Sequence, residues 1–378
     1  MNGLRLSLSL VLLLNSASAW CEEAAHATAA GTPPLALNCR GDLDFTADYL
    51  LANDAGIQGA GWKTYPASVL AVLDKERQAA KDVQSPSACE ALIERFMASI
   101  RSGHLWARAK SSLTPPQESS QSTPKPEGVT TQRLSARTSL ITVPAFWEED
   151  RQQLLKAIEK NHDGVRDAEN LILDLRKNGG GFDSAFDPLL RLLGPATYHY
   201  EQPDIFASPA NVSAWQAIRP HLPNQETVKW VDALIERMKS SPGGWVPMAD
   251  KPVVVHKIDT SEALGNPKRV VILIDRDCAS SGEQFVLTAR QNPRVTLMGR
   301  NTHGALDASN VRMVMSPSGQ IEISYATTFI RRQQGKQVDM IGIPPDVRLP
   351  ASDNAAAWAQ EVDLALKYLE GTSARPQP

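Results

Sequence analysis

The sequence predicts an α/β fold in which a largely parallel sheet follows a smaller helical region. Short, continuously apolar runs such as "NLILDLR" (170–176) and "RVVILID" (269–275) are typical of strands that are buried on both faces. Stretches with helical periodicity, such as "EEDRQQLLKAIEKNH" (148–162), lie between these runs. Because strands and helices alternate along the same region, we expect helices to cover both faces of one sheet.

Changes in composition and periodicity divide the chain into successive segments. The prediction is a signal peptide at 1–19, a flexible mature N-terminus at 20–36, a helical domain at 37–110, a Pro- and Ser-rich linker at 111–133, an α/β domain at 134–370 and a flexible tail at 371–378. Within the α/β domain, residues from about 200 to 268 lack clear periodicity and are predicted to be an insertion.

The first nineteen residues, "MNGLRLSLSLVLLLNSASA", have the pattern of a secretory signal. Arg5 supplies the positive end, residues 6–14 the apolar core, and residues 17–19 the small side chains of a cleavage site after Ala19. The alternative is a membrane anchor, but the apolar core is about half of the roughly 20 residues that a spanning helix needs. We therefore expect a secreted or periplasmic protein with no stable membrane insertion after cleavage.

Four cysteines follow the predicted signal. Cys39 and Cys89 flank the helical region, and because exported proteins meet oxidising conditions, they are predicted to form a disulfide. Cys278 is expected to be buried and unpaired. The cysteines form no CxxC motif and no spaced Cys/His set, so we expect no metal site and no cofactor. A formal charge of -3 gives no reason to expect nucleic acid as a partner.

Two segments that follow buried strands carry residues suited to chemistry. Gly179, Gly180 and Gly181 let the backbone turn sharply and leave N–H groups free for an anion or oxyanion. The alternatives are a plain tight turn or a nucleotide-phosphate loop, and the second lacks a following Gly-Lys-Ser/Thr. In "RDCASSGEQF" (276–285), Ser280 with Glu283 fits a helix capping box, but the same position also suits a nucleophile.

These segments, with a third near the end of the chain, carry a family resemblance. "DLRKNGGG" (174–181), "DRDCASSGE" (275–283) and "DMIGIPPDVRL" (339–349) occur in this order. They resemble the "DLRxNGGG", "VLVDxxTASASE" and "EGxGIxPDV" motifs of the tail-specific, or C-terminal-processing, serine peptidases and their tricorn-core relatives. The resemblance covers about residues 134–350, including "SLITVPAF" (139–146) where the family has "GYIRIxxF".

The resemblance implies a crotonase-like (ClpP/crotonase-type) α/β catalytic core. It makes Ser280 the nucleophile, with Ser281 as a competing candidate, and it places oxyanion-hole donors at Gly179, Gly180 and the backbone of Ser281. Backbone N–H groups at a glycine loop and a helix start are suited to the negative charge of a tetrahedral intermediate.

One position departs from the tail-specific branch, and it concerns the general base. That branch has a lysine in "TFGKG", but this chain has "THGAL" (302–306) with Ala305 in the lysine's place. The tricorn-like branch instead uses a histidine before the glycine loop, which corresponds to His104 in "IRSGHLWA" (100–107). His303 is the competing base. The acid of that branch corresponds to Asp339, which is expected to orient the histidine.

The sequence therefore predicts an exported serine endopeptidase that acts on peptides or proteins through Ser280, His104 and Asp339. About 30 residues separate His104 from the first strand of the core, which is too few for a PDZ domain, so none is expected. One alternative is a catalytically inactive member of the superfamily that acts as a binding or scaffold protein. Another is an acyl-thioester enzyme of the crotonase type, but an exported protein is not expected to meet a CoA substrate. Asp307 and Asp277 are expected to be solvated loop carboxylates.

Overall fold

The computed structural model describes residues 36–110, 128–222, 224–265, 267–332, 336–350 and 355–371. The predicted signal peptide, almost all of the predicted flexible N-terminus and tail, and most of the predicted linker lie outside the described residues. Within these ranges, no helix has both the length and the apolar character needed to span a bilayer.

A six-stranded sheet forms the centre of the structure, with the order β13–β10–β9–β4–β3–β2. All neighbouring strands are parallel except the edge pair β2–β3. The strands are β2 (Thr130–Arg133), β3 (Thr138–Thr142), β4 (Asn170–Asp174), β9 (Arg269–Ile274), β10 (Val295–Gly299) and β13 (Val347–Arg348). The largely parallel sheet confirms the predicted α/β class.

The last residues of the predicted linker are part of this sheet. Strand β2 pairs antiparallel with β3 and has a polar sequence, TTQR, of exposed and half-buried side chains. An edge strand exposes one of its sides to solvent, so it does not need the apolar run by which buried strands are recognised. The boundary predicted at residue 133 is therefore placed too late.

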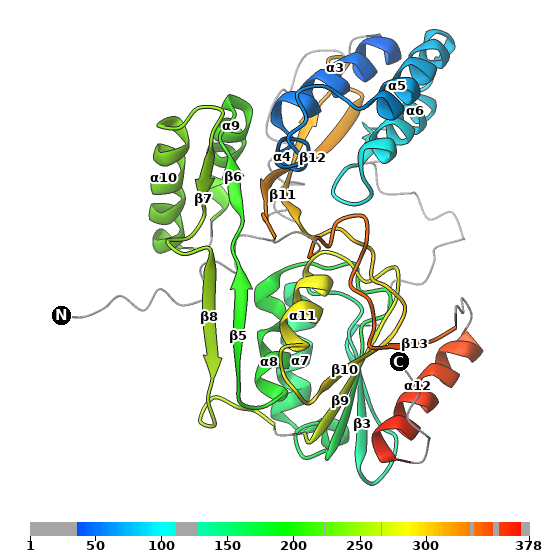
Figure 1. Ribbon diagram of the computed structural model, residues 1–378, viewed down its shortest axis with the longest axis vertical. Helices are drawn as coiled ribbons and strands as arrows, with labels where there is room; N and C mark the ends of the chain where they lie inside the picture. Colours follow the sequence, from blue (N-terminus) through cyan, green and yellow to red (C-terminus); the bar gives the residue numbers. More distant parts are fainter. Residues whose placement is uncertain are drawn as a thin grey trace, which may run out of the picture.

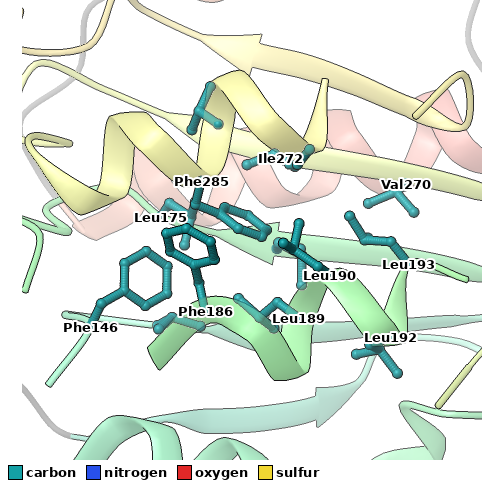
Figure 2. Packing of buried hydrophobic residues seen from close by; sticks show 14 of the residues in the cluster. Phe146, Leu175, Phe186, Leu189, Leu190, Leu192, Leu193, Val270, Ile272 and Phe285 are labelled. Carbon is teal, nitrogen blue, oxygen red and sulfur yellow. The ribbon is translucent and has the colours of Figure 1, made fainter. Parts of the chain in front are cut away.

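Helices cover both faces of the sheet, as the continuous apolar runs predict (Figure 1). The first face packs against α7 (Glu148–Glu159), α8 (Asp187–Leu192) and α11 (Ser281–Ala289), and the second against α12 (Ala355–Glu370). Side chains alternate along each strand, so Leu171 and Leu173 belong to the first core and Ile172 to the second. Figure 2 shows the first core, where the rings of Phe146, Phe186 and Phe285 pack together.

A second sheet, with the order β1–β12–β6–β7 and β11 paired to β12, joins distant parts of the chain. Its strands are β1 (Ala107–Ala109), β6 (Asp204–Phe206), β7 (Trp245–Pro247), β11 (Ala308–Met315) and β12 (Ile321–Phe329). Helices α3 (Cys39–Asn53), α4 (Ala55–Gly59) and α6 (Pro86–Ile100) lie beside β12, and α5 (Ala67–Ala79) packs against α6 and α3 (Figure 1). Their apolar core includes Ile321, Ile323 and Tyr325, so the N-terminal helices share a core with a strand more than 200 residues away in sequence. A disulfide between Cys39 and Cys89 joins α3 to α6.

The predicted insertion extends this second sheet. Strand β6 pairs with the end of β12, and α9 (Pro209–Ala217) and α10 (Gln225–Lys239) build a small apolar core with β6 and β7. A separate antiparallel ribbon is formed by β5 (Ala196–Glu201) and β8 (Val253–Ile258). Short 3-10 helices lie at Ala80–Asp82, His162–Gly164, Asp183–Phe186 and Arg219–His221.

Candidate active site

Ser280 lies where the chain leaves the carboxyl end of β9 and enters α11. Its backbone has a φ of +55°, which is uncommon for a residue other than glycine and is typical of strained functional positions. The backbone N–H of Ser280 donates to the carboxylate of Glu283 at 3.2 Å, as in a capping box. The helix start is thus fixed by Glu283, and the Ser280 hydroxyl is available to another partner.

Glu283 fixes more than the helix start. Its fully buried carboxylate also accepts hydrogen bonds from the N–H groups of Gly304 (2.7 Å) and Ala305 (2.8 Å), and from the hydroxyl of Thr302 (2.5 Å). Burial raises the pKa of Glu283, and these hydrogen bonds oppose that shift. One carboxylate therefore holds the segment 302–305 against the start of α11.

His104 is the side chain that reaches the Ser280 hydroxyl. Its Nε2 lies 3.1 Å from Oγ of Ser280, and its Nδ1 lies 2.6 Å from the carbonyl oxygen of Ala308. A carbonyl only accepts, so the hydrogen of a neutral imidazole is on Nδ1, and the lone pair of Nε2 faces the hydroxyl. Burial lowers the pKa of His104, which favours the neutral form that can take a proton.

The glycine loop after β4 lies directly against Ser280. Gly180 has a φ of +101°, and a Cβ atom there would be 2.8 Å from Cβ of Ser280 and 2.9 Å from the carbonyl oxygen of Ala279. Only glycine allows this close approach. Phe146 holds the loop through two backbone hydrogen bonds. Its N–H donates to the carbonyl oxygen of Gly180 (2.8 Å), and its own carbonyl oxygen accepts from the N–H of Phe182.

The three predicted oxyanion donors are not equivalent. The N–H of Gly180 already donates to Oδ1 of Asn178 at 2.9 Å. Within the described ranges, neither the N–H of Gly179 nor that of Ser281 has a hydrogen-bond acceptor. The hydroxyl of Ser281 donates to the carbonyl of Gly181 at 2.8 Å. The N–H groups of Gly179 and Ser281 are therefore the available backbone donors. The side chain of Ser281 is already bonded to Gly181.

A family model supplies the identification. The model of peptidase family S41 matches residues 137–349, which is more than half of the chain and includes the glycine loop and Ser280. The chain belongs to peptidase family S41. It is a serine peptidase, as the motif resemblance predicts. No curated protein sequence matches the chain.

Solved structures resemble this S41 peptidase over most of its length. Mature CPAF, solved in complex with lactacystin, has a TM-score of 0.58 at 12% sequence identity, with 89% of this chain and 98% of CPAF covered. A putative peptidase from Parabacteroides merdae has a TM-score of 0.52 at 13% identity, with 88% and 97% covered. At such identities, the similarity concerns the fold alone.

The structure gives His104 of the S41 peptidase a different partner from the predicted one. Asp339 makes no hydrogen bond to His104 among the bonds of the described residues; the Ala308 carbonyl takes that place. The carboxylate of Asp339 instead accepts from three consecutive N–H groups, those of Leu306 (2.7 Å), Asp307 (2.6 Å) and Ala308 (3.0 Å). Such a cradle of backbone donors suits a carboxylate, so Asp339 fixes the segment whose carbonyl holds the imidazole.

Asp339 also affects His104 through its charge. The negative carboxylate raises the pKa of His104, which partly offsets the larger lowering caused by burial. Burial and the neighbouring Asp307 raise the pKa of Asp339 itself, and the three backbone hydrogen bonds oppose that shift.

His303, the competing base, lies near the segment that carries His104: a Cβ atom on Gly103 would be 3.5 Å from its ring. Its side chain is exposed, and its Nδ1 is 3.3 Å from the carbonyl oxygen of Arg276. Within the part of the chain that the structure describes, it makes no hydrogen bond to Ser280. The structure thus brings His104, and not His303, to the serine.

Sequence reasoning missed the support beneath Asp339. Asp307, expected in solvent, is buried and accepts from the N–H groups of Val338 (2.7 Å) and Asp339 (3.1 Å). The other oxygen of Asp307 pairs with Arg332 from beyond β12, which compensates the buried charge. Asp307 is separated from Arg332 by 25 positions and from Asp339 by 32, so no local pattern could reveal this network. Within the described ranges, no group of His, Cys, Asp or Glu side chains is arranged to hold a metal ion.

Proposed function

We propose that this S41 peptidase is an endopeptidase that cleaves peptide bonds with Ser280 as nucleophile and His104 as general base. The observation that carries the proposal is the 3.1 Å contact between His104 Nε2 and Ser280 Oγ, with Nδ1 of the same ring held by a carbonyl. A serine hydroxyl is a weak nucleophile until a positioned base takes its proton. The site supplies that base with its lone pair on the correct side.

In the proposed reaction, Nε2 of His104 removes the hydroxyl proton while Oγ of Ser280 bonds to the carbonyl carbon of the substrate. The carbonyl oxygen becomes an oxyanion that the N–H groups of Gly179 and Ser281 stabilise. Collapse of this intermediate breaks the C–N bond, and His104 returns the proton to the leaving amine. A water molecule, activated by the same imidazole, then hydrolyses the acyl-enzyme and regenerates Ser280.

Asp339 is proposed as a positioning residue in this reaction. In a direct triad, the acid accepts from the imidazole, fixes its tautomer and stabilises the imidazolium. Here the Ala308 carbonyl accepts from His104, and Asp339 holds the backbone of that segment while its charge favours the imidazolium. The oxyanion donors and the hydroxyl lie on a core that we propose to be crotonase-like.

Export to the periplasm or out of the cell is also part of the proposal. The signal pattern at residues 1–19 supports it, and so does the disulfide between Cys39 and Cys89, because disulfides persist in oxidising compartments. The proposed substrates are peptides or proteins in that compartment.

A fluorophosphonate probe tests the nucleophile. This probe forms a covalent bond to an activated serine, so the mature protein should be labelled and peptide mapping should place the adduct on Ser280. Ser280→Ala should abolish labelling, whereas Ser281→Ala, which keeps the backbone N–H, should retain it. Absence of labelling in wild-type protein with a folded circular dichroism spectrum would contradict the proposal and favour a binding or scaffold role.

A further inference from the structure

Met340 and Ile341 are the most exposed of the large apolar side chains in the described part of the chain, at 59% and 60%. They are consecutive in sequence, in the loop that follows Asp339. Single exposed apolar side chains are ordinary on protein surfaces, whereas adjacent ones offer apolar surface that another molecule can cover. Among the described residues, no other side chain covers most of the surface of Met340 and Ile341.

The backbone holds these two side chains in place. The N–H of Met340 donates to Gly304 O at 3.0 Å, and the N–H of Gly342 donates to Val338 O at 2.8 Å. A Cβ atom on Gly304 would lie 2.9 Å from the Met340 nitrogen, so the two segments pack backbone against backbone. Met340 has a φ of +68°, a costly conformation that surrounding contacts must impose. The apolar pair is therefore presented by a fixed turn.

This turn lies on the His104 side of the candidate active site. The N–H of Ser102, two residues before His104, donates to Sδ of Met340 at 3.0 Å. The side-chain amide of Asn301 donates to the carbonyl of Ile341 at 3.1 Å, and Asn301 directly precedes the segment 302–305 that Glu283 holds. Met340 thus lies beside the segment 102–104, which carries the imidazole of His104.

We propose that Met340 and Ile341 form a specificity site for an apolar side chain in the leaving-group half of the peptide substrate. This inference rests on the proposed function. A general acid must reach the leaving nitrogen, so the first residue after the scissile bond lies on the His104 side of Ser280. An apolar side chain there would cover surface that the free protein exposes. The unbranched, flexible Met340 can adapt to side chains of different shape.

The test uses the mature full-length protein and an equimolar library of random decapeptides, with cleavage sites read by mass spectrometry. Peptides differing only in Leu or Ser at the first position after the cut then give matched kcat/KM values. The test variant combines Met340→Asn, since Asn tolerates a positive φ, with Ile341→Thr, which keeps the β-branch. Val255→Thr, at a side chain that is 56% exposed on β8, is the matched control.

For wild type and the Val255 variant, we expect kcat/KM for the Leu peptide to be at least about tenfold higher than for the Ser peptide. Apolar sites discriminate between side chains on this scale. The double variant should lose this preference while fluorophosphonate labelling, which involves no leaving peptide, keeps its wild-type rate. A preference that persists in the double variant, or its absence in wild type, overturns the inference alone. Failure of wild type to label or to cleave any peptide overturns the proposed function and this inference with it.

Discussion

Replacing Asp339 with Asn separates a direct catalytic triad from the arrangement in this structure. One oxygen of Asp339 accepts from Leu306 and Asp307, and the other accepts from Ala308. An Asn side chain keeps the first two hydrogen bonds but turns its amide N–H groups toward the N–H of Ala308. One buried backbone donor is then unsatisfied, at a cost of about 1–3 kcal/mol in the free energy of unfolding.

The expected loss of activity in Asp339→Asn follows from that local cost. The unsatisfied N–H of Ala308 displaces the carbonyl of the same residue, which holds His104. If this displacement raises the activation free energy by the same 1–3 kcal/mol, kcat/KM falls about 5- to 150-fold. Asn in a direct triad fixes the wrong tautomer of the histidine and lowers kcat by about 10⁴-fold. The carbonyl of Ala308 still holds the correct tautomer of His104 here, so the smaller loss is predicted.

The assay compares kcat/KM on one peptide, together with urea unfolding, for wild type, Asp339→Asn and the exposed control Asp250→Asn. A second readout is the pH profile. Because the charge of Asp339 raises the pKa of His104, its removal should shift the acidic limb of the profile to lower pH. A loss near 10⁴-fold, or an acidic limb that moves to higher pH, would refute the backbone-mediated role.

Three further predictions follow from the geometry. In wild type, kcat/KM should fall with decreasing pH through a midpoint below about 6.5, since neutral His104 is the proposed base and burial lowers its pKa; a midpoint above that value is the contrary result. Gly180→Ala should slow probe labelling about 100-fold, because a Cβ atom there displaces Ser280, whereas Gly319→Ala, at a glycine that also has a positive φ but no atom nearby, should not; equal rates would be contrary. Replacing Cys39 and Cys89 with Ser removes a disulfide between residues 50 positions apart, so urea titrations should show a free energy of unfolding lower by about 4 kcal/mol. An unchanged urea midpoint of unfolding contradicts this.

The centre of the fold could be predicted from the sequence because its signal is local. Strands β4 and β9 read as continuous apolar runs, and the glycine loop and Ser280 follow them directly. These strands are parallel neighbours in the sheet, so their carboxyl ends lie side by side and bring the loop to the serine. Motif order and strand pattern together were sufficient to predict that Ser280 and the glycine loop lie together.

The rest of the site depends on contacts that leave no local pattern. The partner of Nδ1 of His104 is the backbone carbonyl of Ala308. Every residue has such a carbonyl, so the residue type at position 308 does not indicate this role. Asp339 was found by its place in a motif, but its three backbone partners come from a segment about 30 residues earlier. The N-terminal helices were predicted as a domain of their own, whereas β12 completes their core. Such pairings become visible only when the chain is folded.

The most direct test of the account is the rate of fluorophosphonate labelling in two histidine variants. His104→Ala removes the proposed base, whose Nε2 lies 3.1 Å from Oγ of Ser280, whereas His303→Ala removes an exposed imidazole that contacts the carbonyl of Arg276. The account predicts that labelling of Ser280 is lost in folded His104→Ala and continues at the wild-type rate in His303→Ala. Labelling that survives in His104→Ala but is lost in His303→Ala would contradict it.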